Sequence, residues 1–304
     1  MVVSSRTFRS MLFAASVLAG IALQFPVMAQ QVTGSMQEAL QKAEQGDAEV
    51  QYAAAYAALS AEDTPEELLS EAVRLLQKSA SAGHAASQYL LGVVYLNGHG
   101  VTRNPALAWQ SLQAAAKSGN NEARNALGQM LHKGNGVPRD PAAAAEWFRL
   151  AAAEGNNEAM ANLGFLYMNG LGVTKDLQKG LELTQTAADA GVTEAQHNLG
   201  WIYEKGEAID KNIAEALRWY LLAAENGYGP AQLNAGFIYA TGEAGGEMRE
   251  QLTQAVKWFA LASTSADSKL QNTARGAIKH MVERVPAEII DGGLQAARKW
   301  AWTH

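Results

Sequence analysis

The chain has 304 residues, of which 48% are hydrophobic, and a formal net charge of −6 from 24 basic and 30 acidic residues. This balance excludes a strongly basic surface and argues against nucleic acid as the main partner. Because the chain contains no cysteine, disulfides, thiolate metal sites and cysteine nucleophiles are also excluded. The length is compatible with one large domain or two ordinary ones.

Residues 1–29 have the pattern of a signal peptide. Arg6 and Arg9 precede an apolar stretch from Met11 to Phe25, and Val27-Met28-Ala29 offers the small residues that a signal peptidase reads. We expect cleavage after Ala29, which takes the net charge from −6 to −8 and places the mature chain in the periplasm or outside the cell. The alternative is an uncleaved membrane anchor, although the apolar stretch is shorter than the ~20 residues that a spanning helix needs.

From residue 83 onward, glycine recurs with a period of 36 residues. Three series hold this spacing: Gly83, Gly119, Gly155, Gly191 and Gly227; Gly92, Gly128, Gly164, Gly200 and Gly236; and Gly98, Gly134, Gly170, Gly206 and Gly242. A period of this size indicates a solenoid of stacked supersecondary units. The second series is called the inner glycines below.

Each repeat is expected to contain two helices. Ala159, Leu163, Leu166 and Tyr167 share one helical face, and Gly170 is placed to end that first helix. The second helix should begin after a residue that can accept a hydrogen bond from a free helix N–H group, which is Asn104, Asp140, Asp176 or Asn212. Pro105 and Pro141 then occupy the first helical position, where a missing N–H costs nothing. An inner glycine costs about 1 kcal/mol relative to alanine, so we expect it to allow a neighbouring helix to approach closely.

The two ends of the array depart from the repeat. We assign residues 30–82 to a degenerate capping repeat, 83–264 to five repeats and 265–304 to C-terminal capping helices. Thr64 and Glu67 have the spacing of a capping box at a helix start. The stretch "PAEIIDGGLQAARKWAW" is expected to form a final helix that covers the last apolar face, as the end of a solenoid requires.

The pattern "A…LG..Y..G.GV..D…A..W" over about residues 46 to 285 resembles the Sel-one-like repeat, a relative of the tetratricopeptide repeat. The resemblance implies an all-α fold, a right-handed superhelical solenoid of stacked antiparallel helix pairs with a period of 36 residues. It also implies a scaffold that holds other proteins, as do bacterial members of the family that regulate sensor kinases, act in host contact or assist envelope assembly. Some cysteine-rich secreted members are linked to β-lactam binding or hydrolysis, and this chain lacks those cysteines.

In tetratricopeptide domains the concave groove is lined by the first helices, so the resemblance implies that the same positions bind a partner here. On each first helix, the residues three before, one after and four after the inner glycine lie on one face of the helix, which we call the stripe. The residue six before the inner glycine lies on the same side. The series three before and four after include Asn125, Ala161 and Met168, and the series one after includes Val93. The candidate binding residues on the stripe are Tyr89, Phe165, Trp201, Phe237, Glu122, Glu158, Glu194, His197 and Glu204.

Phe165, Trp201 and Phe237 are expected to form an aromatic row. Beside it, an acidic row that steers a basic partner is expected from Glu122, Glu158 and Glu194. Alternatively, the aromatic rings pack on the adjacent repeat, and the glutamates are solvated or favour the helix dipole.

No catalytic motif stands out in the sequence. The histidines lack the spacing of a helical zinc site, and neither a G-x-S-x-G elbow nor an S-x-x-K motif followed by S-D-N occurs. We therefore predict an exported, non-enzymatic scaffold without metal or cofactor that binds an apolar and basic protein segment. The alternatives are a protein that binds cell-wall peptidoglycan or polysaccharide and, in third place, a β-lactam-type hydrolase.

Overall fold

The computed structural model describes residues 36–61 and 64–303, and the predicted signal peptide lies outside this range. The described residues form fifteen helices and no strand, which confirms the all-α prediction. The chain divides into two compact units between Asn156 and Asn157. None of the described helices is long and apolar enough to cross a membrane.

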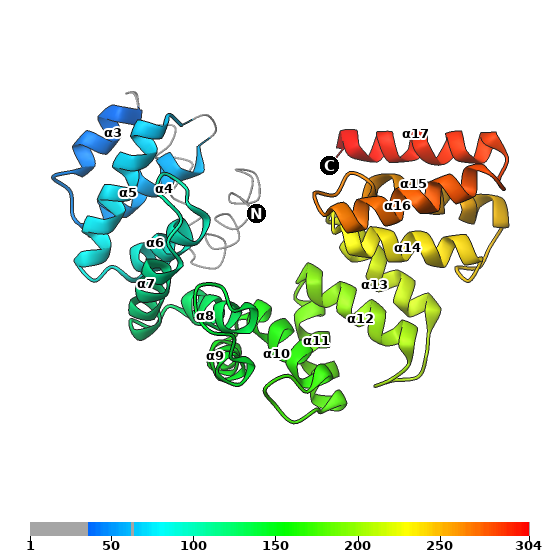
Figure 1. Cartoon of the computed structure of the whole chain (residues 1–304), viewed down its shortest axis with the longest axis horizontal. Coiled ribbons are helices and arrows are strands. Elements are labelled where there is room, and N and C mark those ends of the chain that lie inside the picture. Colours follow the sequence, from blue (N-terminus) through cyan, green and yellow to red (C-terminus); the bar gives the residue numbers. More distant parts are fainter. Residues whose placement is uncertain (1–35, 62–63, 304) are drawn as a thin grey trace. The chain divides into compact units, whose positions relative to one another are not determined.

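In the first unit, consecutive helices contact each other in pairs (Figure 1). Its helices are α3 (Met36–Ala43), α4 (Ala48–Ser60), α5 (Glu66–Ser81), α6 (Ala85–Asn97), α7 (Pro105–Lys117), α8 (Asn121–Lys133) and α9 (Pro141–Ala153). The apolar core lies between these helices and includes Leu75, Leu76 and Leu90, which are almost fully buried.

The second unit continues the same pairing. Its helices are α10 (Asn157–Asn169), α11 (Leu177–Asp189), α12 (Thr193–Lys205), α13 (Ile213–Glu225), α14 (Gly229–Thr241), α15 (Met248–Ala262), α16 (Ser268–Val282) and α17 (Ala287–Thr303). Close packing joins α10 to α11, α12 to α13 and α14 to α15. In addition, α11 contacts α12 and α13 contacts α14, while α15 contacts the terminal helices α16 and α17.

Within a repeat, the start of the second helix and the end of the first are fixed by residues that the sequence singled out. The side-chain oxygens of Asn104, Asp140, Asp176 and Asn212 each accept a hydrogen bond from the backbone N–H three residues later, over 3.0–3.1 Å. At the end of α10, Gly170 has a φ of 64°, which places it in the left-handed region that suits glycine. These contacts confirm the predicted caps.

The inner glycines lie where the two helices of a repeat cross. Gly164 is buried, and a Cβ atom added to it would lie 2.7 Å from the Thr184 hydroxyl oxygen and 3.1 Å from the carbonyl oxygen of Gly180. Both of these atoms belong to α11. The glycine therefore allows α10 and α11 to approach more closely than any side chain would permit, as predicted.

The capping box expected at Thr64 and Glu67 does not form. The Thr64 hydroxyl instead donates to the carbonyl oxygen of Ala58 over 2.9 Å, and α5 begins after Pro65 without a side-chain cap. The prediction was wrong because a hydroxyl can also satisfy the free carbonyl groups at the end of the preceding helix, here α4.

The predicted final helix is α17, and it packs on α15 (Figure 1). Ile289, Ile290 and Ala297 are buried on its inner face. A Cβ atom on Gly293 would lie 2.5 Å from that of Val256, so this glycine allows α17 to lie close against α15.

Candidate functional site

Three large aromatic side chains are exposed at equivalent positions of three successive first helices. Phe165 on α10, Trp201 on α12 and Phe237 on α14 each follow an inner glycine and are 41%, 37% and 43% exposed. Because consecutive helical residues are turned by about 100°, the residue after a buried inner glycine leaves the packed face. We call these three residues the aromatic row.

At least one ring of the row packs against a buried aromatic ring. Phe237 contacts the ring of Phe259 edge to face, with ring centroids 5.1 Å apart and an interplanar angle of 70°. Phe259 is 1% exposed and belongs to the core of the unit. Phe237 therefore contacts the core while it remains 43% exposed.

The rest of the predicted stripe is only partly at the surface. Val93, Asn125, Ala161 and Met168 are each less than 10% exposed, so these positions do not line a groove. The prediction was wrong for them because these side chains face neighbouring helices and fill the core; Ala161 and Met168, for example, belong to one apolar cluster. Tyr89 on α6 is half-buried and packs against the apolar core of the first unit.

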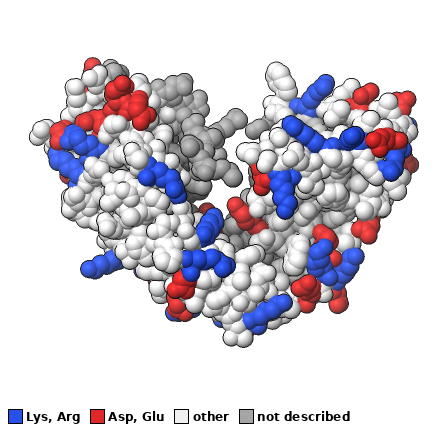
Figure 2. Space-filling view, viewed as in Figure 1, with Lys and Arg blue, Asp and Glu red and all other residues white. Residues whose placement is uncertain are grey.

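The predicted acidic residues lie in the first turn of their helices. Glu158 on α10 and Glu194 on α12 are exposed in the second unit, whereas Glu122 on α8 is half-buried in the first unit. A carboxylate in the first turn also favours the helix dipole. Lysines, arginines and acidic side chains are intermixed on the face in Figure 2, and no broad area there carries one sign of charge.

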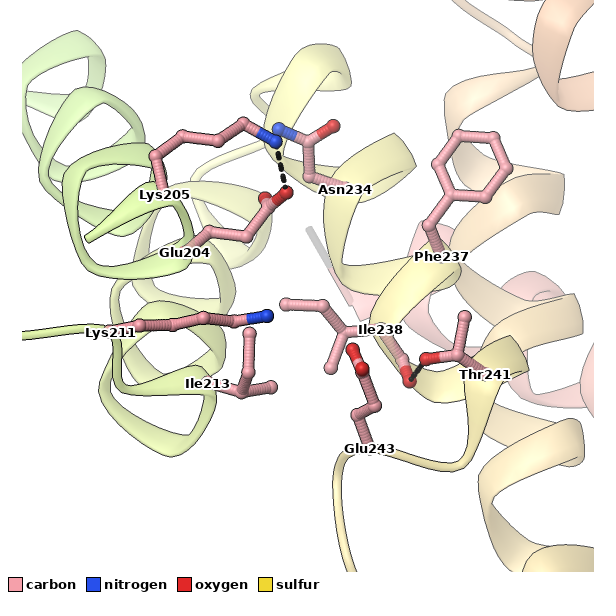
Figure 3. Close-up of a pocket in the computed structure, with 9 residues that line it drawn as sticks. All are labelled: Glu204, Lys205, Lys211, Ile213, Asn234, Phe237, Ile238, Thr241 and Glu243. Carbon is pink, nitrogen blue, oxygen red and sulfur yellow. Dashed lines mark hydrogen bonds and ion pairs between the residues drawn. The ribbon is translucent and has the colours of Figure 1, made fainter. Parts of the chain in front are cut away.

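Beside Phe237, a pocket of about 480 Å³ opens between α12, the loop before α13, and α14 (Figure 3). It is lined by Glu204, Lys205, Lys211, Ile213, Asn234, Phe237, Ile238, Thr241 and Glu243. Glu204 and Phe237, both candidates from the sequence, thus share one pocket. Its wall combines apolar side chains with both signs of charge.

On the pocket wall, Glu204 accepts hydrogen bonds from two side chains. The Tyr220 hydroxyl donates to its Oε2 atom and the Lys205 ammonium to its Oε1 atom, each over 2.8 Å. Burial by itself would raise the pKa of Glu204, but the hydrogen bonds from Lys205 and Tyr220 outweigh it and the pKa lies below the usual value. Glu204 is therefore ionised at neutral pH and fixed in orientation.

His197 is hydrogen-bonded to Asn234, another residue of the pocket wall. The Asn234 amide nitrogen donates to its Nε2 atom over 3.2 Å, and its ring lies 5.5 Å from that of Tyr220 and 5.3 Å from that of Tyr228. An amide nitrogen can only donate, so Nε2 accepts and carries no proton. Burial lowers the pKa of His197, which agrees with a neutral ring that links α12 to α14.

Sequence reasoning missed Tyr220, Asn234 and Lys211 as parts of this site. Tyr220 and Asn234 act through contacts with residues 16 and 37 positions away, which no local periodicity reveals. Lys211 lies in the loop before α13, and in Figure 3 its side chain extends toward Ile238. A register of all five repeats could have drawn attention to Asn234, since polar residues are unusual inside packed first helices.

In the first unit, Ser87, His84 and Glu49 form a hydrogen-bonded line with the residue types of a hydrolase triad. Ser87 Oγ lies 2.8 Å from His84 Nδ1, and His84 Nε2 lies 2.9 Å from a carboxylate oxygen of Glu49. However, Ser87 is completely buried and its hydroxyl also contacts that of Ser79 over 2.7 Å. A substrate could not reach it, so this line holds α4, α5 and α6 together. No group of three or more metal-ligating side chains occurs among the residues that the structure describes.

Comparison with known proteins agrees with this architecture. The Sel1 repeat matches six consecutive segments, residues 48–84, 85–120, 121–156, 157–192, 193–228 and 229–267. A Sel1 repeat protein from Oxalobacter formigenes is similar in structure, with a TM-score of 0.63 and 26% identity over 77% of this chain and 92% of that one.

A second similar structure is c5321, a protective antigen present in uropathogenic Escherichia coli strains. It has a TM-score of 0.57 and 24% identity over 99% of this chain and 72% of that one, and it displays the same repeat fold. No curated protein matches the chain in sequence. The repeated match over most of its length shows that the chain belongs to the Sel1 repeat family.

Proposed function

We propose that this protein is a non-catalytic scaffold that binds a segment of another protein on the aromatic row of its second unit. Sel1 repeat solenoids are typical scaffolds for protein–protein interaction. The observation that carries the proposal is the exposure of Phe165, Trp201 and Phe237 at one equivalent position of three consecutive repeats. Exposed aromatic rings at a fixed spacing are not needed to stabilise the core, whereas aromatic anchors supply most of the binding energy of many interfaces.

The surroundings of the row favour a preorganised site. The bond between His197 and Asn234 connects α12 to α14, and Tyr220 fixes Glu204 beside the pocket. A surface that is already rigid loses less conformational entropy when a partner binds. The row therefore has both the apolar anchors and the stiffness that a peptide-binding surface needs.

The acidic character of the chain supports a partner with basic residues. Glu158 and Glu194 are exposed on the same helices as Phe165 and Trp201, and the chain as a whole carries a net charge of −6. Opposite charge on the partner would speed the encounter and would make binding sensitive to salt.

Photo-crosslinking in cells tests this proposal. A photoreactive phenylalanine analogue replaces Trp201 in one strain and Leu222 in another; both side chains are 37% exposed in the same repeat, but Leu222 lies on the second helix, α13. We expect a discrete protein adduct from position 201 and none from position 222. Equal labelling from both positions, or labelling of cell-wall polymer alone, would remove the proposed site.

We further propose that the protein is exported and acts on an envelope or signalling partner in the periplasm or outside the cell. The support is the pattern of residues 1–29, with two arginines, an apolar stretch and small residues before position 30. N-terminal sequencing of protein from a periplasmic extract should begin at Gln30. A chain that still begins at Met1 and sediments with membranes would contradict export in a cleaved form.

A further inference from the structure

The spacing of the aromatic row restricts what can bind to it. Helices α10 and α12 contact each other directly, and α12 and α14 are joined by the bond between His197 and Asn234. Axes of packed helices lie about 8–10 Å apart. Because Phe165, Trp201 and Phe237 occupy one position on these three helices, they offer an apolar contact at roughly that interval.

Three backbone conformations can be compared with this interval. A polyproline II helix repeats every three residues and rises about 3.1 Å per residue, so its equivalent side chains recur every ~9.3 Å on one face. A β-strand places side chains on one face about every 7 Å. An α-helix matches only through every seventh residue, at about 10.5 Å. The polyproline II helix and the α-helix therefore fit, and the β-strand does not.

The width of the row separates the two remaining conformations. An α-helix with its side chains is about 10–12 Å across and would need apolar contacts on both sides of each ring. On α10 the stripe positions flanking Phe165 are Ala161 and Met168, which are 6% and 8% exposed and are used by the core. On α12 the corresponding positions are His197 and Glu204, whose side chains are already hydrogen-bonded. On α10 and α12 the row is thus one side chain wide, as a narrow extended ligand requires. On α14 the flanking Leu233 and Ala240 are half-buried and pack against the core.

We propose, on the basis of the function above, that the ligand is a basic segment in the polyproline II conformation, with proline or another apolar residue at every third position. Rigid proline-rich segments dock on aromatic-lined grooves in other proteins because their conformation is already formed before binding. Lysine or arginine between the prolines faces Glu158 and Glu194, which are exposed in the first turns of α10 and α12. Three contacts require a segment of about seven residues.

Fluorescence anisotropy with labelled synthetic peptides and the purified full chain tests the proposal. The first peptide carries proline at every third position with lysines between. A second has the same composition with the proline spacing scrambled, and a third is an amphipathic helix with apolar residues at every seventh position. We expect the first peptide to bind at least about tenfold more tightly than either of the others, and its affinity to fall as salt is added.

Variants place the binding on the row. Trp201→Ala should weaken binding of the first peptide by more than about tenfold, Glu194→Gln should reduce the salt dependence, and Leu222→Ala should change neither. Preference for the helical or the scrambled peptide, or no binding of the first peptide, overturns this inference. If the crosslink from position 201 still forms in that case, the proposed scaffold function stands without it; if that crosslink is absent, both fail.

Discussion

Replacing Gly164 by alanine is the sharpest test of how the repeats pack. The added Cβ would lie 2.7 Å from the Thr184 hydroxyl oxygen, 3.1 Å from the Gly180 carbonyl oxygen and 3.2 Å from the Thr184 backbone nitrogen. Two of these three atoms belong to the backbone of α11, which cannot rotate away as a flexible side chain can. The two helices must therefore separate by a few tenths of an ångström or more.

Two opposing effects set the size of the change. Alanine in place of glycine stabilises a helix by about 1 kcal/mol. Overpacking a well-packed contact costs about 1–3 kcal/mol, and the backbone contacts at Gly164 favour the upper part of that range. We expect a net loss of roughly 1–2 kcal/mol in unfolding free energy, and a larger loss with local unfolding for Gly164→Leu. At ~2–4 °C per kcal/mol for a chain of this size, Gly164→Ala lowers the melting temperature by a few degrees.

Gly276 provides the matched control. It also lies inside a helix, α16, but nothing lies within 4 Å of the Cβ that alanine would add. Gly276→Ala should therefore raise the unfolding free energy by up to about 1 kcal/mol. Urea denaturation followed by circular dichroism measures both variants. If Gly164→Ala is as stabilising as Gly276→Ala, then close helix approach is not the reason for the inner glycines.

Further predictions concern a helix cap and a buried ring. Asn212→Ala removes the cap that accepts the Glu215 N–H and should cost about 1 kcal/mol in denaturation experiments, whereas Asp210→Ala nearby should have almost no effect. Because burial lowers the pKa of His197 in the folded state, the unfolded chain binds this proton more readily, and stability should fall as the pH drops below the usual histidine pKa of about 6.5. Melting temperatures from pH 8 to pH 5 should show this loss, and His197→Gln should flatten the slope; an unchanged slope would show that the ring contributes nothing to it.

The fold was predictable because its main signals are local and repeated. A capping residue such as Asp176 acts on the N–H three residues later, and Gly170 ends the helix in which it lies. Each of these signals is readable without knowing any distant contact. Thr64 shows the limit of local reasoning, because its hydroxyl had two possible roles: to accept an N–H at the start of the next helix or to donate to a carbonyl at the end of the previous one. It donates to the carbonyl oxygen of Ala58.

The site was only partly predictable for a related reason. The register placed Phe165, Trp201 and Phe237 at equivalent positions, and the structure exposes all three. The same register wrongly placed Ala161 and Met168 at the surface, because the positions four residues before and three after Phe165 on its helix still lie partly against neighbouring helices. Periodicity gives the direction of a side chain but not the width of the surface that its neighbours leave open.

The pocket beside the row depended wholly on contacts between repeats. Asn234 reaches His197 across α12 and α14, and Lys211 enters from a loop whose path is set by the α13 cap at Asn212. Lys211 nevertheless has basic counterparts at the same position of the repeat, namely Lys175, Arg139 and Arg103, and Asn234 has Asn198 and Asn162. The repeat therefore supplies these residue types, and contacts between neighbouring repeats decide which of them line a pocket.

The packing at the inner glycine Gly200 should control the position of the aromatic row. A Cβ on Gly200 would lie 2.7 Å from a ring carbon of Tyr220 and 3.1 Å from the Ala216 carbonyl oxygen. Tyr220 holds Glu204 on the pocket wall, so Gly200→Ala should shift the neighbouring Trp201 and the pocket together. Both stability and peptide affinity should fall.

Gly128 is the control for this coupling. Its added Cβ would lie 2.6 Å from a ring carbon of the buried Phe148. This clash with an aromatic ring belongs to the first unit, whereas the aromatic row belongs to the second. Gly128→Ala should lose stability to a similar extent and retain peptide affinity, measured at a temperature where both variants are folded. Equal losses of affinity in the two variants would mean that binding responds to stability in general. Loss in Gly200→Ala alone would mean that the packing of α12 on α13 sets the position of the row, and that the spacing read by the ligand is the spacing of the helices themselves.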